Sequence, residues 1–297
     1  TVSHDYIMHY YGWVKSISGA GELPLWNPYI FSGLPMLGSA ALCPFYPSQW
    51  LYAILPFNTA FTLQYVLALA VGGIGAGWWM RCLGHRRAVC VWAGLLYMFS
   101  GHFLTLTYAG HLQKMIALGW TPVALGATIQ VMQLGRTGVK HSRRYKAASL
   151  LGIALGMQLL ATHPQVFYAT AAACVLQLMG MALISVPWRA IMTGTATGAH
   201  KPSRALQKIG RAVAMSLLAL VVCGAIAAVQ LFPSLEMSAF SNRADGVSFA
   251  EATQTSYPPM EILEYAVPSV FGDSVKGSGQ VYSGKWGERI VSDFLGL

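Results

Sequence analysis

The sequence predicts an all-α membrane protein, built as a polytopic transmembrane helical bundle. Hydrophobic residues make up 55% of its 297 residues and charged residues only 10%, whereas soluble chains average roughly 25% charged residues. The acids are also unevenly placed, because none occurs from residue 23 to residue 235. Long apolar stretches without acids are typical of segments that cross a bilayer. Two soluble domains, a disordered chain, collagen and a coiled coil are therefore excluded.

Six apolar runs have about the length needed to cross a membrane, roughly 20 residues. They are Asn58–Met80, Ala88–Tyr108, Lys114–Leu134, Ala147–Thr162, Pro164–Val186 and Ala212–Phe232. The fourth run is the shortest, and we expect it to tilt little or to be partly re-entrant. The first run contains the glycine-rich stretch VGGIGAG (71–77). Because these glycines lie inside an apolar span, we expect them to permit close helix packing.

The basic residues predict which way the bundle faces. Thirteen of the 19 lie in three loops, 81–87, 136–146 and 189–211. Six spans put these loops on one side, and the positive-inside rule makes that side the cytoplasm. The net charge of +9 then fits loops that face anionic lipid, and no motif indicates nucleic acid. Residues 1–57 and 233–297 are predicted to be extracytoplasmic, and they hold all ten acids.

The chain therefore divides into a first outer loop (1–57), a six-span bundle (58–232) and an outer C-terminal segment (233–297). In the first loop, aromatic residues recur at helical spacing between Asp5 and Ser18, which predicts an interfacial helix.

Further short helices are predicted at Pro44–Pro56, Ser248–Thr253 and Pro259–Ala266. Because residue 1 is already extracytoplasmic by the charge rule, we expect this chain to be part of a longer protein, cut at both ends.

The cysteines indicate neither a disulfide nor a metal site. The five show no CxxC spacing, and four of them lie in the predicted spans or at their inner edge. Cys43 alone lies in an outer segment, where we expect a thiol reagent to reach it. No zinc or haem site, and no other cofactor, is suggested by this pattern.

Ionisable residues near the outer membrane surface form the candidate site. They are His4, Asp5, Glu22, His102, His111, Lys114, His163, Glu236 and Arg243. Ionisable groups near a bilayer are costly to bury and are often functional, although each one alone is also explained as a helix cap or a water-facing side chain. Asp5 is either a general base toward an acceptor hydroxyl or the N-cap of the helix that follows it. Lys114, Arg243 or the histidines would neutralise a phosphate leaving group.

Several sequence blocks follow one another in a characteristic order. They are GELPLWNPYIFSGLPMLGSAALCPFYPSQWLYAILP (21–56), LLYMFSGHF (95–103), GHLQKMIALGWTPVAL (110–125), LLATHPQVFYA (159–169) and AAVQLFPSLEMSAFSNR (227–243). With the glycine-rich first span, they resemble the YfhO-like bacterial membrane proteins, which are related to the GT-C glycosyltransferases. The resemblance covers essentially the whole chain and corresponds to the N-terminal part of a longer family member.

The resemblance implies a GT-C-like bundle in the bacterial inner membrane. GT-C enzymes transfer a sugar from a polyprenyl-phosphate donor to an acceptor on the outer face of the membrane. Asp5 matches the acid that precedes the aromatic helix in the family, which implies the role of base. The chain has one acid there and not the paired acids of many GT-C enzymes, so a divalent metal stays open but is not indicated. The implied partners are the lipid-linked sugar donor and membrane lipids.

The leading hypothesis is therefore a membrane glycosyltransferase of GT-C type that acts on a cell-envelope acceptor. In this hypothesis Lys114, Arg243 and His111 hold the phosphate. The pocket is shaped by His102, His163 and Glu236. The alternative is a non-catalytic accessory or scaffold subunit of a larger membrane complex. A transporter is disfavoured, because the spans contain no acid that would serve a proton relay.

Overall fold

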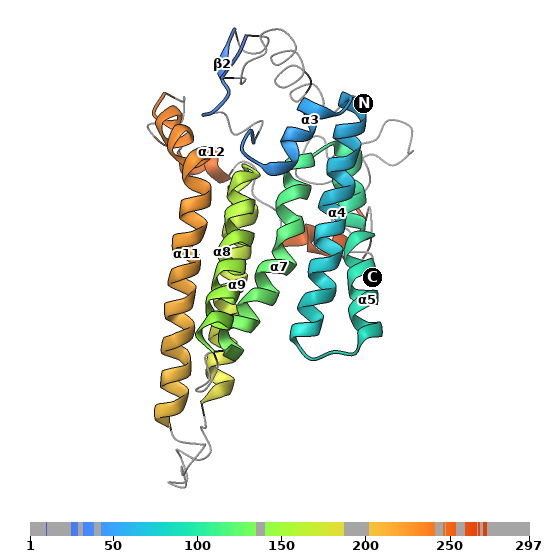
Figure 1. Cartoon of the computed structure of the whole chain (residues 1–297). Coiled ribbons are helices and arrows are strands. Elements are labelled where there is room, and N and C mark those ends of the chain that lie inside the picture. The colour runs from blue at the N-terminus through green and yellow to red at the C-terminus, as the bar shows by residue number, and fades with distance from the viewer. Residues whose placement is uncertain are drawn as a thin grey trace.

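The molecule is a bundle of long helices with several short elements outside it (Figure 1). The computed structural model describes residues 10, 25–28, 32–38, 43–134, 140–186, 202–240, 246, 248–253, 259–265, 267 and 270–271. The main helices are α4 (Phe57–Cys82), α5 (Arg87–Met98), α6 (Gly101–Ala109), α7 (Leu112–Leu134), α8 (His141–Leu160), α9 (Pro164–Ser185) and α11 (Pro202–Ser238). The long helices run roughly along one axis (Figure 1).

Five helical segments among the described residues are long and apolar enough to cross a membrane. They are Phe57–Cys82, Arg87–Thr107, Leu112–Gln133, Pro164–Ser185 and Ala205–Ser238. These segments overlap five of the six predicted spans to within a few residues, and they indicate a multi-pass membrane protein.

The fourth predicted span, Ala147–Thr162, is not among these segments. It forms most of α8, but α8 begins earlier and carries Arg143, Arg144 and Lys146 in its first turns. The apolar part, residues 147–160, is about 21 Å long at 1.5 Å per residue, less than the roughly 30 Å of hydrocarbon in a bilayer. Ten of the helix's 20 residues are buried, because α8 packs against α7 and α11. The apolar part of α8 is therefore too short to cross the hydrocarbon alone, and neighbouring helices cover much of its surface.

The second predicted span is one apolar segment, Arg87–Thr107, but it consists of two helices. Helices α5 and α6 are separated by Phe99 and Ser100. Ser100 has an extended backbone (φ −63°, ψ 146°) and is the N-cap residue of α6. An extended residue ends the helical hydrogen-bond ladder, so α6 starts as a new helix.

The helices alternate in direction, which gives the bundle two distinct ends. Gln133 Nε2 of α7 donates to the Cys82 carbonyl oxygen of α4 at 3.0 Å, so these two helices end together. We call this the basic end, because the described parts of the basic loops, residues 81–87 and 140–146, lie at the helix termini here. The opposite end, where residues 43–56 lead into α4 and where α7 and α9 begin, is called the loop end (Figure 1).

Glycines bring α4 and α5 into backbone contact, which confirms the predicted role of the 71–77 stretch. A Cβ added to Gly94 would lie 2.7 Å from the Gly73 carbonyl oxygen, and one added to Gly77 would lie 2.8 Å from the Cys90 carbonyl oxygen. On the α7 side, a Cβ at Gly72 would lie 3.4 Å from the Gly119 Cα. Only glycine allows backbones to approach this closely.

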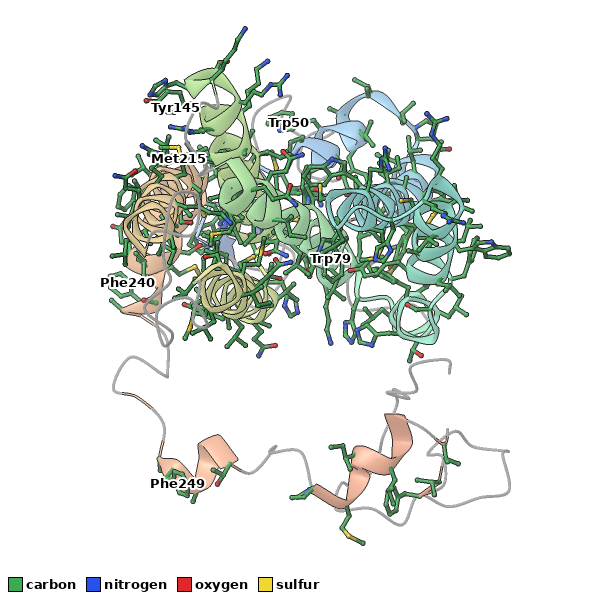
Figure 2. The ribbon with its side chains drawn as sticks, turned by 90° about the horizontal axis from the view of Figure 1, so that it is seen from below. Trp50, Trp79, Tyr145, Met215, Phe240 and Phe249 are labelled. Atoms are coloured by element: carbon green, nitrogen blue, oxygen red, sulfur yellow. The ribbon has the colours of Figure 1, made fainter. Side chains whose placement is uncertain are left out.

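The short predicted helices are found where the structure describes them. Residues 44–56 contain η2 (Pro47–Trp50) and α3 (Leu51–Ile54), and the C-terminal segment contains α12 (Phe249–Thr253) and η4 (Pro259–Tyr265). In Figure 2, α12 with its labelled Phe249, and the short helix that follows it, lie apart from the bundle.

The predicted helix at residues 5–18 lies outside the described residues except for Tyr10. The ring centroid of Tyr10 lies 5.3 Å from that of Phe57 at the start of α4.

A small hairpin in the first segment was not predicted. Strands β1 (Trp26–Asn27) and β2 (Leu34–Pro35) pair antiparallel. Gly33 before β2 has φ 112°, and a Cβ there would lie 2.3 Å from the Trp26 ring. The turn therefore needs glycine both for its backbone conformation and for the ring beside it.

Replacement of Gly94 by Ala should destabilise the bundle by roughly 1–3 kcal/mol, as overpacking of a tight contact does. The new Cβ meets a backbone oxygen, which cannot rotate away. Thermal unfolding in detergent measures the effect. Gly180→Ala on α9 is the matched control, because a Cβ there meets nothing within 4 Å. Equal melting temperatures for the two variants would contradict the close contact.

Cysteines placed at the two ends should be labelled from opposite sides of the membrane. Ile54 at the loop end is 75% exposed, and Leu83 at the basic end is 49% exposed. With Cys82 and Cys90 replaced by Ser, an impermeant thiol reagent added outside intact cells should label Ile54→Cys and not Leu83→Cys. Labelling of Leu83→Cys alone would show that the orientation is the reverse of the predicted one. Labelling of both variants would show that the two ends do not lie on opposite sides of the membrane.

Candidate functional site

Five of the nine predicted site residues lie in the described part of the chain. His102 is half-buried in α6, His111 is exposed immediately before α7, and Lys114 is half-buried in the first turn of α7. His163 is half-buried immediately before α9, and Glu236 is exposed near the C-terminal end of α11. The other four, His4, Asp5, Glu22 and Arg243, lie outside the described residues.

The structure brings three of these residues together at the loop end. Burial, and then the charges of Lys114 and His111, lower the pKa of His163. The turn before α7 and the turn before α9 therefore place their basic side chains within electrostatic reach of one another. Among the described residues, His102 and Glu236 do not contribute to this pKa shift. We call His111, Lys114 and His163 the basic triplet.

The backbone beside the triplet is unusual. Thr162 has φ 56°, a left-handed conformation that is uncommon for a residue other than glycine. The Thr162 Oγ1 is buried and has no hydrogen-bond partner among the described residues. The THPQ turn thus holds a polar atom in a position where an unpaired group is costly.

This arrangement can hold an anion. Lys114 supplies a positive charge, and His163 supplies a ring whose pKa is lowered first by burial and then by its basic neighbours. Helices α7 and α9 both begin at this end, so their partial positive charges point the same way. Phosphate oxygens accept hydrogen bonds from such groups. Among the described residues, no group of three or more His, Cys, Asp or Glu side chains is placed to hold a metal ion.

A second feature, absent from the sequence prediction, is a cavity beneath the loop-end segment 43–51. It has a volume of about 320 Å³ and lies between that segment and helices α4, α7 and α8. Its lining is mostly apolar, with polar atoms from Tyr46, Ser48, Gln64 and Trp120. The sequence prediction considered ionisable groups only, although a glutamine inside an apolar span was a visible signal.

The roof of this cavity is fixed by side-chain hydrogen bonds. The Ser48 Oγ and the Gln49 Nε2 donate to the Gln64 Oε1 at 3.0 and 3.1 Å. The Trp120 Nε1 donates to the Tyr46 hydroxyl at 2.9 Å. Burial raises the pKa of Tyr46 to about 12, so this hydroxyl stays protonated at physiological pH.

Cys43 takes part in the same network, and its predicted accessibility was wrong. Its side chain is fully buried, and its Sγ accepts a hydrogen bond from the Gln49 Nε2 at 3.1 Å. The residue does lie outside the spans, but the segment that carries it folds back onto the bundle.

Comparisons of the chain with family models, curated proteins and solved structures give no match. The resemblance to the YfhO-like proteins therefore remains a prediction from the sequence.

Removal of the Lys114 charge should raise the pKa of His163, because the ammonium group opposes protonation of the imidazole. The titration of the His163 ring, followed by NMR in the Lys114→Gln variant, measures this shift. Lys140→Gln is the matched control, since Lys140 is exposed before α8 at the basic end. An unchanged pKa in Lys114→Gln would show that the two side chains are not neighbours.

Proposed function

We propose that the protein is a membrane glycosyltransferase of GT-C type, located in the bacterial inner membrane. It transfers a sugar from a polyprenyl-phosphate donor to a cell-envelope acceptor at the loop end, which faces away from the cytoplasm. The observation that carries this proposal is the convergence of His111, Lys114 and His163 at one end of the bundle. Their chemistry fits the phosphate of a lipid-linked donor better than an uncharged ligand.

The position of the triplet supports this choice of ligand. Lys114 lies in the first turn of α7, where a span meets the headgroup region, and a lipid phosphate lies at the same depth. The apolar outer faces of α9 and α11 would lie in the lipid, so an isoprenoid tail can run alongside them. Such a donor would keep its tail in the bilayer and its phosphate at the triplet.

In the proposed reaction, an acceptor hydroxyl attacks the anomeric carbon of the donor sugar. A bond forms between that oxygen and the anomeric carbon, and the bond between the anomeric carbon and the phosphate oxygen breaks. Asp5 takes the proton of the hydroxyl as general base. The electron pair of the broken bond stays on the polyprenyl phosphate, whose added charge is stabilised by Lys114.

Binding of polyprenyl phosphate, compared with the uncharged polyprenol, tests the triplet. In the full-length protein, Lys114→Gln should lower the preference for the phosphate about tenfold, which corresponds to about 1.4 kcal/mol. Lys140→Gln at the basic end should leave the preference unchanged. If Lys114→Gln also leaves it unchanged, the triplet is not the phosphate site.

A transfer assay then separates catalysis from binding. Asp5→Asn should keep the binding of polyprenyl phosphate and lose sugar transfer, because asparagine cannot accept the proton. Unchanged transfer would remove Asp5 from the mechanism. Binding without transfer in the unaltered full-length protein would instead favour the accessory subunit.

A further inference from the structure

We propose that the cavity beneath segment 43–51 binds one acyl chain of a membrane glycerophospholipid, with the ester carbonyl oxygen of that chain accepting a hydrogen bond from Gln64. This lipid is distinct from a polyprenyl-phosphate donor, which has no ester carbonyl, and the proposal does not depend on sugar transfer. It rests on the orphaned amide of Gln64, the size and lining of the cavity, and its depth in the membrane.

In the side-chain amide of Gln64, the oxygen has hydrogen-bond partners and the nitrogen has none among the described residues. Its Oε1 accepts two hydrogen bonds from the roof residues Ser48 and Gln49. Its Nε2 is buried and has no partner among the described residues, and the side chain as a whole is only 1% exposed. An unpaired buried donor costs roughly 1–3 kcal/mol. Gln64 is one of the residues that line the cavity, and a ligand acceptor that reaches the Nε2 from there would remove this cost.

The cavity has a size and a lining that suit part of a lipid acyl chain. Its volume of about 320 Å³ corresponds to about ten groups of water or methylene size, at ~30 Å³ each. Leu67, Val71, Ile116 and Met157 give it apolar walls. Leu67 is also 41% exposed, so the cavity opens beside a surface that would face lipid. The rest of a longer chain can leave by this opening.

The depth of Gln64 suits an ester group. Helix α4 has 26 residues, or about 39 Å at 1.5 Å per residue, against roughly 30 Å of hydrocarbon. Gln64 lies seven residues after the first residue of α4, about 10 Å along the axis. If α4 is centred in the bilayer, the Gln64 Cα lies about 6 Å inside the hydrocarbon boundary, and its side chain tilts toward the N-terminus of the helix and so toward that boundary. The ester groups of glycerophospholipids lie close to that boundary.

Native mass spectrometry of the purified full chain with dioleoylphosphatidylcholine, or with its diether analogue that lacks both carbonyls, tests the proposal. The unaltered protein should retain one ester lipid and prefer it to the diether by about three- to tenfold, the range for one neutral hydrogen bond. Gln64→Leu should bind both lipids equally. Equal retention of ester and diether lipid by the unaltered protein would refute the role of Gln64.

Filling the cavity tests its location. Val71→Phe should abolish retention, because Val71 lines the cavity. Val66→Phe on the same helix is the matched control, since Val66 is 53% exposed and does not line the cavity. Retention that survives Val71→Phe would place the lipid elsewhere. Displacement of the retained lipid by equimolar polyprenyl phosphate would identify the cavity as the site of the isoprenoid donor and overturn the proposal.

Discussion

The register of helices α7, α8 and α9 depends on a buried glutamine that joins all three. The Gln158 Nε2 of α8 lies 3.0 Å from the Ala117 carbonyl oxygen of α7 and 3.1 and 3.0 Å from the hydroxyls of Thr121 on α7 and Thr170 on α9. The amide is fully buried. Because an apolar interior offers no water, these bonds fix the register of α7, α8 and α9 even though each contributes only about 0.6 kcal/mol on average.

Helix α7 is the centre around which this register is built. In its most apolar window 72% of residues are buried, against 11% in α9, and α4, α6, α8, α9 and α11 all pack against it. Its first turns also carry Lys114 and contribute Ile116 and Trp120 to the cavity wall. Helix α7 therefore contributes residues to both the basic triplet and the cavity, and its packing helps to position both.

Composition was sufficient to predict the helical membrane fold, since apolar run length and charge spacing are local properties. The break at Phe99 and Ser100 was not predicted, although the sequence FSGH (99–102) interrupts the apolar run there with polar residues and a glycine. The triplet was partly predictable: the sequence places His111 and Lys114 together but cannot show that His163, about fifty residues later, reaches them. The burial of Cys43 and the orphaned amide of Gln64 result from tertiary packing, which no local pattern records.

Helix α11 sets a limit on how the protein sits in any membrane. Its 37 residues extend about 55 Å at 1.5 Å per residue, whereas a bilayer with its headgroups is roughly 40–45 Å thick. Even if the helix stands upright, about 10 Å of its length must project into water. This excess lies at one end or is divided between the two ends. Helix α11 would therefore still span a somewhat thicker or thinner bilayer. The mismatch between apolar length and bilayer thickness would instead be felt at α8, whose apolar part is shorter.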